Sequence, residues 1–197
     1  MSRPPNKKRP EELRGAIVRY VTRHGLADLS LRPLARAVGS SPRVLLYYFG
    51  SKEKIVMSVL AEIRKQQLTS YGDVTADTMG EVSRIIWQRM IAEESEKTFR
   101  LFFEAYGMAL RRPKLYRSFL RSTVEVWLQL IATGVEAEGL GRAEALAFAT
   151  VMLAGFRGFM LDYCNTRDRK RLDRAVDLWA RSLDTMLVEG KKSSWPR

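Results

Sequence analysis

The sequence has little of what metalloenzymes and disulfide-stabilised proteins use. Among its 197 residues there is one cysteine, Cys164, and one histidine, His24. A single cysteine cannot form a disulfide within the chain, and its presence suits a reducing compartment. One histidine and one distant cysteine do not provide the usual ligands of zinc, so we expect no metal site. The same shortage leaves no setting for a histidine-dependent catalytic triad.

Other absences narrow the class of protein further. There is no glycine-rich loop that could cradle a phosphate, and no nucleophile lies beside a candidate base, so we expect neither catalytic residues nor a cofactor. No apolar run follows the basic start, which argues against a secretory signal. The most apolar segment, residues 145–161, is interrupted by Thr150 and Arg157 and is too short for a convincing membrane span. These features predict a cytoplasmic protein without a membrane partner.

Helical spacing and positive charge are what the chain has in quantity. Apolar residues recur every three or four positions and nowhere alternate as in strands, so we expect an all-α fold of about nine helices. The formal net charge is +12, and residues 1–54 carry twelve Lys and Arg against four Asp and Glu. Such a concentration of positive charge is typical of a protein that binds a polyanion. The alternative is a basic, soluble surface that has no partner.

The segment Leu29–Lys54 has the pattern of two short helices joined by a tight turn. Ser30 is expected to cap the first of these helices, and Gly39 is expected to end it in a left-handed conformation. Ser41 is expected to cap the second helix, with Pro42 at its first position, where the missing N–H is no loss. A helix, a turn with glycine and a second helix with a basic, aromatic outer face predict a helix-turn-helix.

This segment also resembles a known family. The run SLRPLARAVGSSPRVLLYYFGSKEKI is similar to the amino-terminal signature of TetR-type transcriptional regulators. Leu46 departs from the pattern, because the family usually has tyrosine there, and a DNA contact from this position is left open. The resemblance implies a DNA-binding head over residues 1–54 and a ligand-binding and dimerisation body over residues 55–197. The positions that match are Leu34, Ala35, Val38, Gly39, Ser41, Leu45, Tyr47, Tyr48, Phe49, Ser51, Lys52 and Glu53.

The second helix of the motif is expected to read the major groove of double-stranded DNA. Arg43, near its start, is the best candidate for base reading, because a guanidinium can bond both O6 and N7 of guanine. We expect further base contacts from Ser41, Pro42, Val44 and Tyr47. Phosphate contacts are expected from Ser30, Arg32, Tyr48, Lys52 and Lys54. In an alternative arrangement, Tyr47 or Tyr48 packs beneath the head instead.

Large, adaptable side chains gather in the second part of the chain. They are typical of a cavity for a small, largely apolar molecule, and the family resemblance places a ligand among these helices. The predicted ligand-binding residues are Trp87, Phe102, Phe103, Tyr106, Phe119, Trp127, Met152, Phe156 and Met160. The alternative is that these side chains only fill a helical core.

The last two predicted helices, residues 142–165 and 171–189, carry apolar and small residues at helical spacing. In a homodimer these stripes would form a four-helix contact, whereas in a monomer they would face the core. The predicted interface residues are Ala154, Gly158, Leu172, Val176, Trp179, Leu183 and Met186.

Together these features predict a sequence-specific, DNA-binding transcriptional regulator. The leading hypothesis is a dimeric repressor that a small, apolar effector releases from a palindromic operator. One alternative is a DNA-organising protein that has the same head and no ligand. A second alternative is a small helical enzyme, for which the sequence offers no catalytic constellation.

Overall fold

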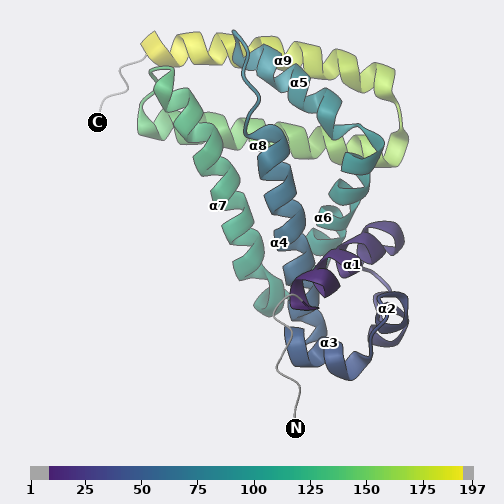
Figure 1. Ribbon diagram of the computed structural model, residues 1–197. Coiled ribbons are helices and arrows are strands. Elements are labelled where there is room, and N and C mark those ends of the chain that lie inside the picture. The colour runs from purple at the N-terminus through teal and green to yellow at the C-terminus, as the bar shows by residue number, and fades with distance from the viewer. Residues whose placement is uncertain (1–8, 193–197) are drawn as a thin grey trace. The chain divides into compact units, whose positions relative to one another are not determined.

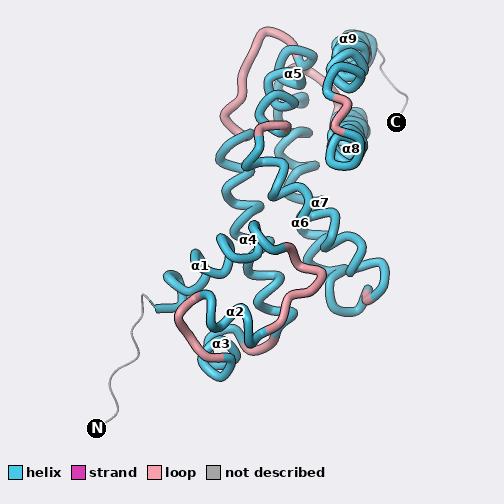
Figure 2. Tube along the Cα trace, turned by 90° about the vertical axis from the view of Figure 1, so that its right-hand side faces the viewer, coloured by secondary structure: helices cyan, strands magenta, loops and turns pink. Residues whose placement is uncertain are grey.

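The computed structural model describes residues 9–192, and every regular element within this range is a helix (Figures 1 and 2). The prediction of an all-α fold is therefore confirmed. The helices of the described part of the chain are α1 (Arg9–His24), α2 (Leu31–Ala37), α3 (Pro42–Phe49), α4 (Lys52–Tyr71), α5 (Met79–Met90), α6 (Glu93–Arg111), α7 (Pro113–Ala137), α8 (Arg142–Thr166) and α9 (Arg169–Lys192).

Most helix starts follow from local sequence. The Ser41 hydroxyl accepts a hydrogen bond from the Val44 N–H at 3.3 Å, and the Ser51 hydroxyl accepts one from the Lys54 N–H at 3.2 Å. Both serines thus satisfy a free donor of the first helical turn. Ser30 stands before α2 with extended backbone, but its side chain makes no capping bond, so that part of the prediction is wrong. The reason is local: Pro33 occupies the third helical position and has no N–H to donate.

The chain divides into two compact units. The first comprises the residues up to Gln67 together with Lys97–Phe119, and the second comprises Leu68–Glu96 together with the residues from Leu120 onward. Helices α4, α6 and α7 each contribute residues to both units. A compact unit is therefore not a single stretch of sequence, and the predicted boundary at residue 54 stays a prediction about function.

The first unit has a continuous apolar core. Leu34 of α2 and Leu45 of α3 are fully buried in it, together with residues from α1, α4 and α6. Tyr116 of α7 belongs to the same core and is 3% exposed. The helix-turn-helix is thus held by side chains that come more than sixty residues later in the sequence.

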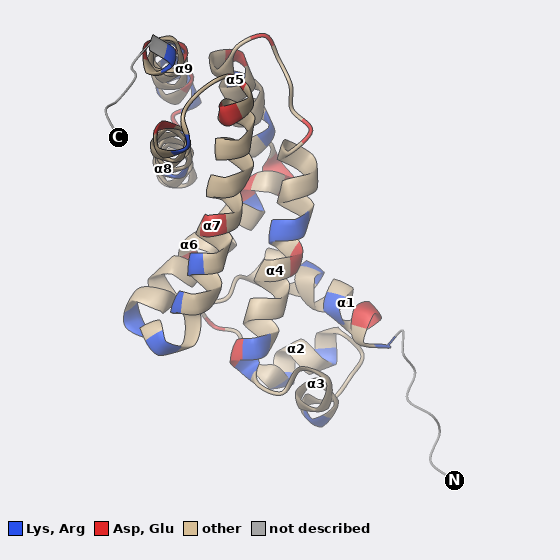
Figure 3. Ribbon diagram, turned by 90° about the vertical axis from the view of Figure 1, so that its left-hand side faces the viewer, with Lys and Arg blue, Asp and Glu red and all other residues tan. Residues whose placement is uncertain are grey.

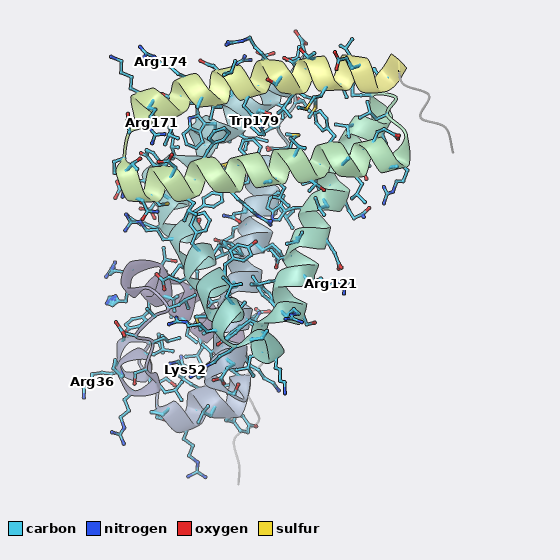
Figure 4. The ribbon with its side chains drawn as sticks, turned by 180° about the vertical axis from the view of Figure 1, so that it is seen from behind. Arg36, Lys52, Arg121, Arg171, Arg174 and Trp179 are labelled. Atoms are coloured by element: carbon cyan, nitrogen blue, oxygen red, sulfur yellow. The ribbon has the colours of Figure 1, made fainter. Side chains whose placement is uncertain are left out.

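In the second unit, α9 packs closely against α5 and α8. The Trp87 indole N–H donates to Asp173 at 2.7 Å, and the Phe156 and Phe159 rings lie edge-on to Trp179. Figure 4 shows Trp179 between α8 and α9. Helix α8 is long and apolar enough to cross a membrane by composition alone, yet one of its faces is buried inside this unit.

A tight turn joins α8 to α9. Arg167 closes α8 in a left-handed conformation with φ of 58°, and its guanidinium donates to the buried carboxylate of Glu96 at the start of α6. The same guanidinium lies over the Tyr163 ring, 5.4 Å from the ring centre. A charged, bonded partner stabilises a carboxylate that burial would otherwise disfavour.

Candidate nucleic-acid interface

Helix α3 has a buried side and an exposed side. Leu45 is 0% exposed and anchors the helix, whereas Arg43, Val44 and Tyr47 face outward. Tyr47 is 75% exposed, which is unusual for a large aromatic side chain that has no partner surface. An eight-residue helix that is anchored at one position and presents a guanidinium and a phenol outward is shaped to contact another molecule.

Tyr48 differs from its neighbour. It packs against the core of the first unit, and its ring lies edge-on to Tyr47 with the ring centres 5.0 Å apart. The alternative that one tyrosine packs beneath the head therefore describes Tyr48, while Tyr47 remains available. The Tyr48 ring orients the Tyr47 ring. Because Tyr48 is half-buried, its hydroxyl is the one group of its side chain that is suited to a phosphate contact.

Positive side chains surround the exposed face of α3. Arg32 and Lys54 are exposed, and Lys52 is half-buried in the first turn of α4. Figure 3 shows Lys and Arg positions in blue on α2, on α3 and at the start of α4. Arg36 on α2 was not among the predicted contacts, although it is exposed and points away from the protein (Figure 4). Its position four residues after Arg32 on one helix is the signal that could have identified it.

Ser30, Ser41 and Pro42 occupy the edges of this surface. The two serines are exposed, and Pro42 is half-buried at the first position of α3. The Ser41 hydroxyl accepts a hydrogen bond from Val44 as the cap of α3, and a DNA contact from this residue stays a prediction. Leu46, which stands at the family's usual tyrosine position, is 38% exposed and offers only an apolar surface.

The turn between α2 and α3 is held from α1. Gly39 has φ of 60°, the left-handed conformation expected for it, and no atom would lie within 4 Å of an added Cβ. The Arg9 guanidinium at the start of α1 donates to the Gly39 carbonyl at 3.3 Å. The glycine is therefore required by its backbone conformation and not by crowding.

The carboxylate of Glu53 lies in the first turn of α4. A hydrogen bond to its own backbone N–H, followed by one with Ser51, lowers the pKa of Glu53 below its ordinary value. Its negative charge favours the start of α4, where backbone N–H groups point outward. The carboxyl group therefore remains ionised in neutral solution.

A side chain of α6 holds the turn between α1 and α2. The Glu104 carboxylate accepts hydrogen bonds from the backbone N–H of Leu26 and, at 3.0 Å, from that of Ala27. Gly25 precedes this turn with φ of 80°, and an added Cβ would lie 3.1 Å from the Glu104 carboxylate. Glu104 therefore fixes the start of the helix-turn-helix relative to α6, within the first unit.

Glu104→Ala is expected to loosen the α1–α2 turn, because the partly buried N–H of Leu26 loses its acceptor. Leaving such a donor unpaired costs about 1–3 kcal/mol. Hydrogen exchange of the Leu26 and Ala27 amides should accelerate. In Glu104→Gln, which keeps an acceptor oxygen, the exchange rates should lie between those of the unaltered protein and those of Glu104→Ala. Unchanged exchange at both amides in Glu104→Ala would contradict this role.

The predicted ligand-binding residues are divided between the two compact units. Phe102, Phe103, Tyr106 and Phe119 belong to the first unit, whereas Trp87, Trp127, Met152, Phe156 and Met160 belong to the second. Phe102, Tyr106 and Phe119 lie in or against the core that also holds α3, so their burial has a structural cause. Trp127 contacts the Tyr71 ring, with ring centres 6.2 Å apart. A ligand-binding role for these nine positions stays a prediction.

The predicted dimer residues need correction. Leu172, Val176 and Leu183 are at most 1% exposed within a single chain, on a helix that packs closely against α5, so they are not available to a second copy. Trp179 is half-buried against Phe156 and Phe159. The spacing of apolar residues along α9 could not distinguish a face that packs against the core of its own chain from a face that packs against a second copy. Ala154, Gly158 and Met186 are exposed, as an interface requires.

Comparisons with known proteins agree with this fold. Residues 14–59 match the family model described as bacterial regulatory proteins, tetR family. A transcriptional regulator from Rhodococcus sp. Rha1 is 19% identical, with a TM-score of 0.75 over 92% of this chain and 97% of that one. A TetR transcription regulator from Haloarcula marismortui is 16% identical, with a TM-score of 0.71 over 91% of this chain and 98% of its own. The multidrug binding protein EbrR, complexed with imidazole, is 21% identical, with a TM-score of 0.66 over 91% and 96% of the two chains. No curated protein matches the chain significantly.

Proposed function

We propose that this chain, which belongs through its amino-terminal segment to the TetR family of bacterial regulatory proteins, is a repressor. A small molecule releases it from a palindromic operator. The matching family and the similar structures are transcriptional regulators and not enzymes. DNA binding by the helix-turn-helix is the function of that family segment. Repression, release by an effector, the palindrome and a cytoplasmic location are the proposed parts.

The observation that carries the proposal is the two-sided α3. Its apolar side is anchored by Leu45, and its opposite side presents Arg43 and Tyr47 among the cations of α2 and α4. A helix in this setting fits the major groove, where Arg43 can bond a guanine and the surrounding cations can contact phosphates. One short helix reads too few base pairs for useful specificity, so we expect two copies on one site.

Selection of bound sequences from random duplex DNA tests the proposal directly. A dimer that reads two successive major grooves should enrich a near-palindrome with half-site centres about 34–36 Å apart. Enrichment of one unrepeated half-site would contradict the symmetric dimer. No enrichment at low salt would contradict sequence-specific binding altogether. A ligand-independent DNA-organising protein would bind duplexes of any sequence with similar affinity.

The proposed dimer uses the exposed face of α8. Apolar and small residues of this face recur at helical spacing, a pattern suited to close helix packing between two copies. The exposed residues proposed for the interface are Ala147, Val151, Ala154, Gly158 and Leu161 of α8, with Leu178 and Met186 of α9.

Gly158→Leu is expected to weaken the dimer without disturbing the folded chain. In a single chain no atom lies within 4 Å of a Cβ at this position, so a new side chain finds open space there. Across a packed helix pair the same side chain would force the backbones apart. Sedimentation velocity should show a shift toward monomer, while the far-UV circular dichroism stays unchanged. An unaltered dimer would move the interface away from this face of α8.

The proposed effector is small and largely apolar. The predicted ligand positions are aromatic and methionine side chains, and the similar protein EbrR is described as a multidrug binding protein. An effector acts only through its different affinity for the DNA-competent and DNA-incompetent states, so coupling must be reciprocal. A compound that weakens operator binding by a given factor must itself bind more weakly, by the same factor, to the DNA-bound protein.

A further inference from the structure

A second group of cations lies outside the helix-turn-helix, where α6 ends and α7 begins. We call it the basic turn: Arg111, Arg112, Lys114 and Arg117. These residues stand within seven consecutive positions that contain no carboxylate, and all four side chains are exposed. Arg112 is the only residue between the two helices, so the turn is short and its side chains are closely spaced.

The basic turn belongs to the first unit, as does α3. Tyr116, which directly precedes Arg117, is buried in the core that also holds Leu45 of α3 and Ile55 of α4. Its burial fixes the start of α7 against the helices of the DNA-binding head. Figure 3 shows the positive residues of the α6–α7 turn at the end of this unit where α4 begins.

Electrostatic contacts place the turn beside the first turn of α4. Burial, and then the Glu53 carboxylate, raise the pKa of Tyr116, while Arg112 lowers it. Arg112 also contributes to the lowered pKa of Glu53. Arg112 therefore lies close enough to the Glu53 carboxylate for the two charges to interact within the protein.

The other three cations are not used in this way. Within residues 9–192, the side chains of Arg111, Lys114 and Arg117 form no ion pair or hydrogen bond. Lys114 and Arg117 stand near the start of a 25-residue helix that has no acidic residue in its first turn. A positive charge is disfavoured at that end of a helix, so helix stability does not explain these residues.

We propose that the basic turn is a second phosphate-binding surface, which contacts the DNA backbone beyond the phosphates held by α2, α3 and α4. The occupant follows from charge complementarity and from the shared unit with α3, because a duplex held by α3 brings its phosphates to this part of the protein. The inference rests on the proposed function, since it requires DNA to be bound by the head. It adds affinity and salt dependence without adding base preference.

The surface also has an apolar component. Leu110, which precedes the cations, is 85% exposed, and Leu115, which lies among them, is 44% exposed. Exposed leucine beside positive charge also fits an anionic membrane surface. DNA is favoured because the turn shares its unit and core with the helix-turn-helix, and the membrane becomes an outcome of the test.

The test compares two triple variants that change net charge equally. Arg111→Gln/Lys114→Gln/Arg117→Gln neutralises the basic turn, and Arg112 is kept because it lies beside Glu53. The control, Lys170→Gln/Arg174→Gln/Arg181→Gln, neutralises three exposed cations of α9 in the second unit, of which Arg174 points outward in Figure 4. Both proteins are titrated with the operator selected from random DNA and with a mixed-sequence duplex of equal length, over a range of salt concentrations.

Each lost phosphate contact should lower affinity roughly fivefold at 0.15 M salt and flatten the slope of log K against log salt by about 0.9. The basic-turn variant should therefore lose affinity for both duplexes alike, and ethylation interference should show specific operator phosphates released. The α9 control should bind as the unaltered protein does. Equal affinity and equal slope in the two variants would overturn the inference.

Two further outcomes are distinguishable. If the unaltered protein selects no operator, the proposed function fails, and the inference fails with it. If the unaltered protein binds phosphatidylserine vesicles but not phosphatidylcholine vesicles, and the basic-turn variant loses only this binding, the surface belongs to a membrane and the DNA proposal is overturned.

Discussion

Arg43→Ala is expected to lower affinity for the selected operator by about 5- to 150-fold, the range of one bidentate arginine–guanine contact. The side chain is exposed near the start of α3 and has no partner among residues 9–192, so the substitution removes nothing from the fold. The loss of affinity should come from one base position. Sequences selected from random DNA by the variant should show a weaker base preference at that position and an unchanged preference at the others. Equal losses on operator and mixed-sequence DNA would remove Arg43 from base reading.

Arg43→Lys separates charge from geometry. Lysine keeps the positive charge but cannot present the planar fork that bonds O6 and N7 of guanine together. Affinity for mixed-sequence DNA should therefore stay, while most of the base preference is lost. Lys52→Ala is the opposite control, because a phosphate contact weakens binding to every sequence and flattens the salt dependence by about one unit of slope.

Gly80→Ala is expected to have the largest effect on stability. Gly80 is buried at the start of α5, and its N–H donates to the Asp184 carboxylate at 2.7 Å. A Cβ would lie 2.3 Å from that carboxylate and 2.7 Å from the Ala180 backbone carbonyl. Neither distance is possible, so α5 and α9 must separate and the N–H must lose its acceptor. Overpacking of this kind costs about 1–3 kcal/mol, and the unpaired donor adds to that.

The matched control is Gly134→Ala in α7. It makes the same chemical change within the same unit, but no atom lies within 4 Å of the new Cβ. Because alanine has a higher helix propensity than glycine, this substitution should stabilise the protein by up to about 1 kcal/mol. Thermal unfolding at one fixed protein concentration should thus move in opposite directions for the two variants. A Gly80→Ala protein as stable as the unaltered chain would contradict the packing of α5 on α9.

Part of this protein was predictable because the signals are local. Proline at the first position of α3, serine caps before α3 and α4, and left-handed glycines after α2 and α3 lie within a few residues of what they control. Ser30 shows the limit of such signals even at short range. Its capping bond fails because Pro33 has no N–H, although the helix begins where it was expected.

The predicted stripe on α9 was misassigned for a different reason. Leu172, Val176 and Leu183 have the spacing of an interface, and they also have the spacing of a helix that covers its own core. Which of the two applies depends on α5, about ninety residues earlier, and no pattern within α9 contains that information. Phe102 and Phe119 lie in or against the core of the DNA-binding head, and their spacing alone does not distinguish packing from the ligand binding that remains predicted for them.

The sequence by itself determined the helices, the helix-turn-helix and the excess of positive charge, because each depends on neighbours three or four positions away or on composition. Only the tertiary structure decided which apolar faces are already covered, and which distant groups, such as Glu104 and the basic turn, lie beside the helix-turn-helix. The physical reason is that burial and electrostatic contact depend on distance in space, and the same residue type serves a core, an interface or a ligand equally well until its neighbours are known.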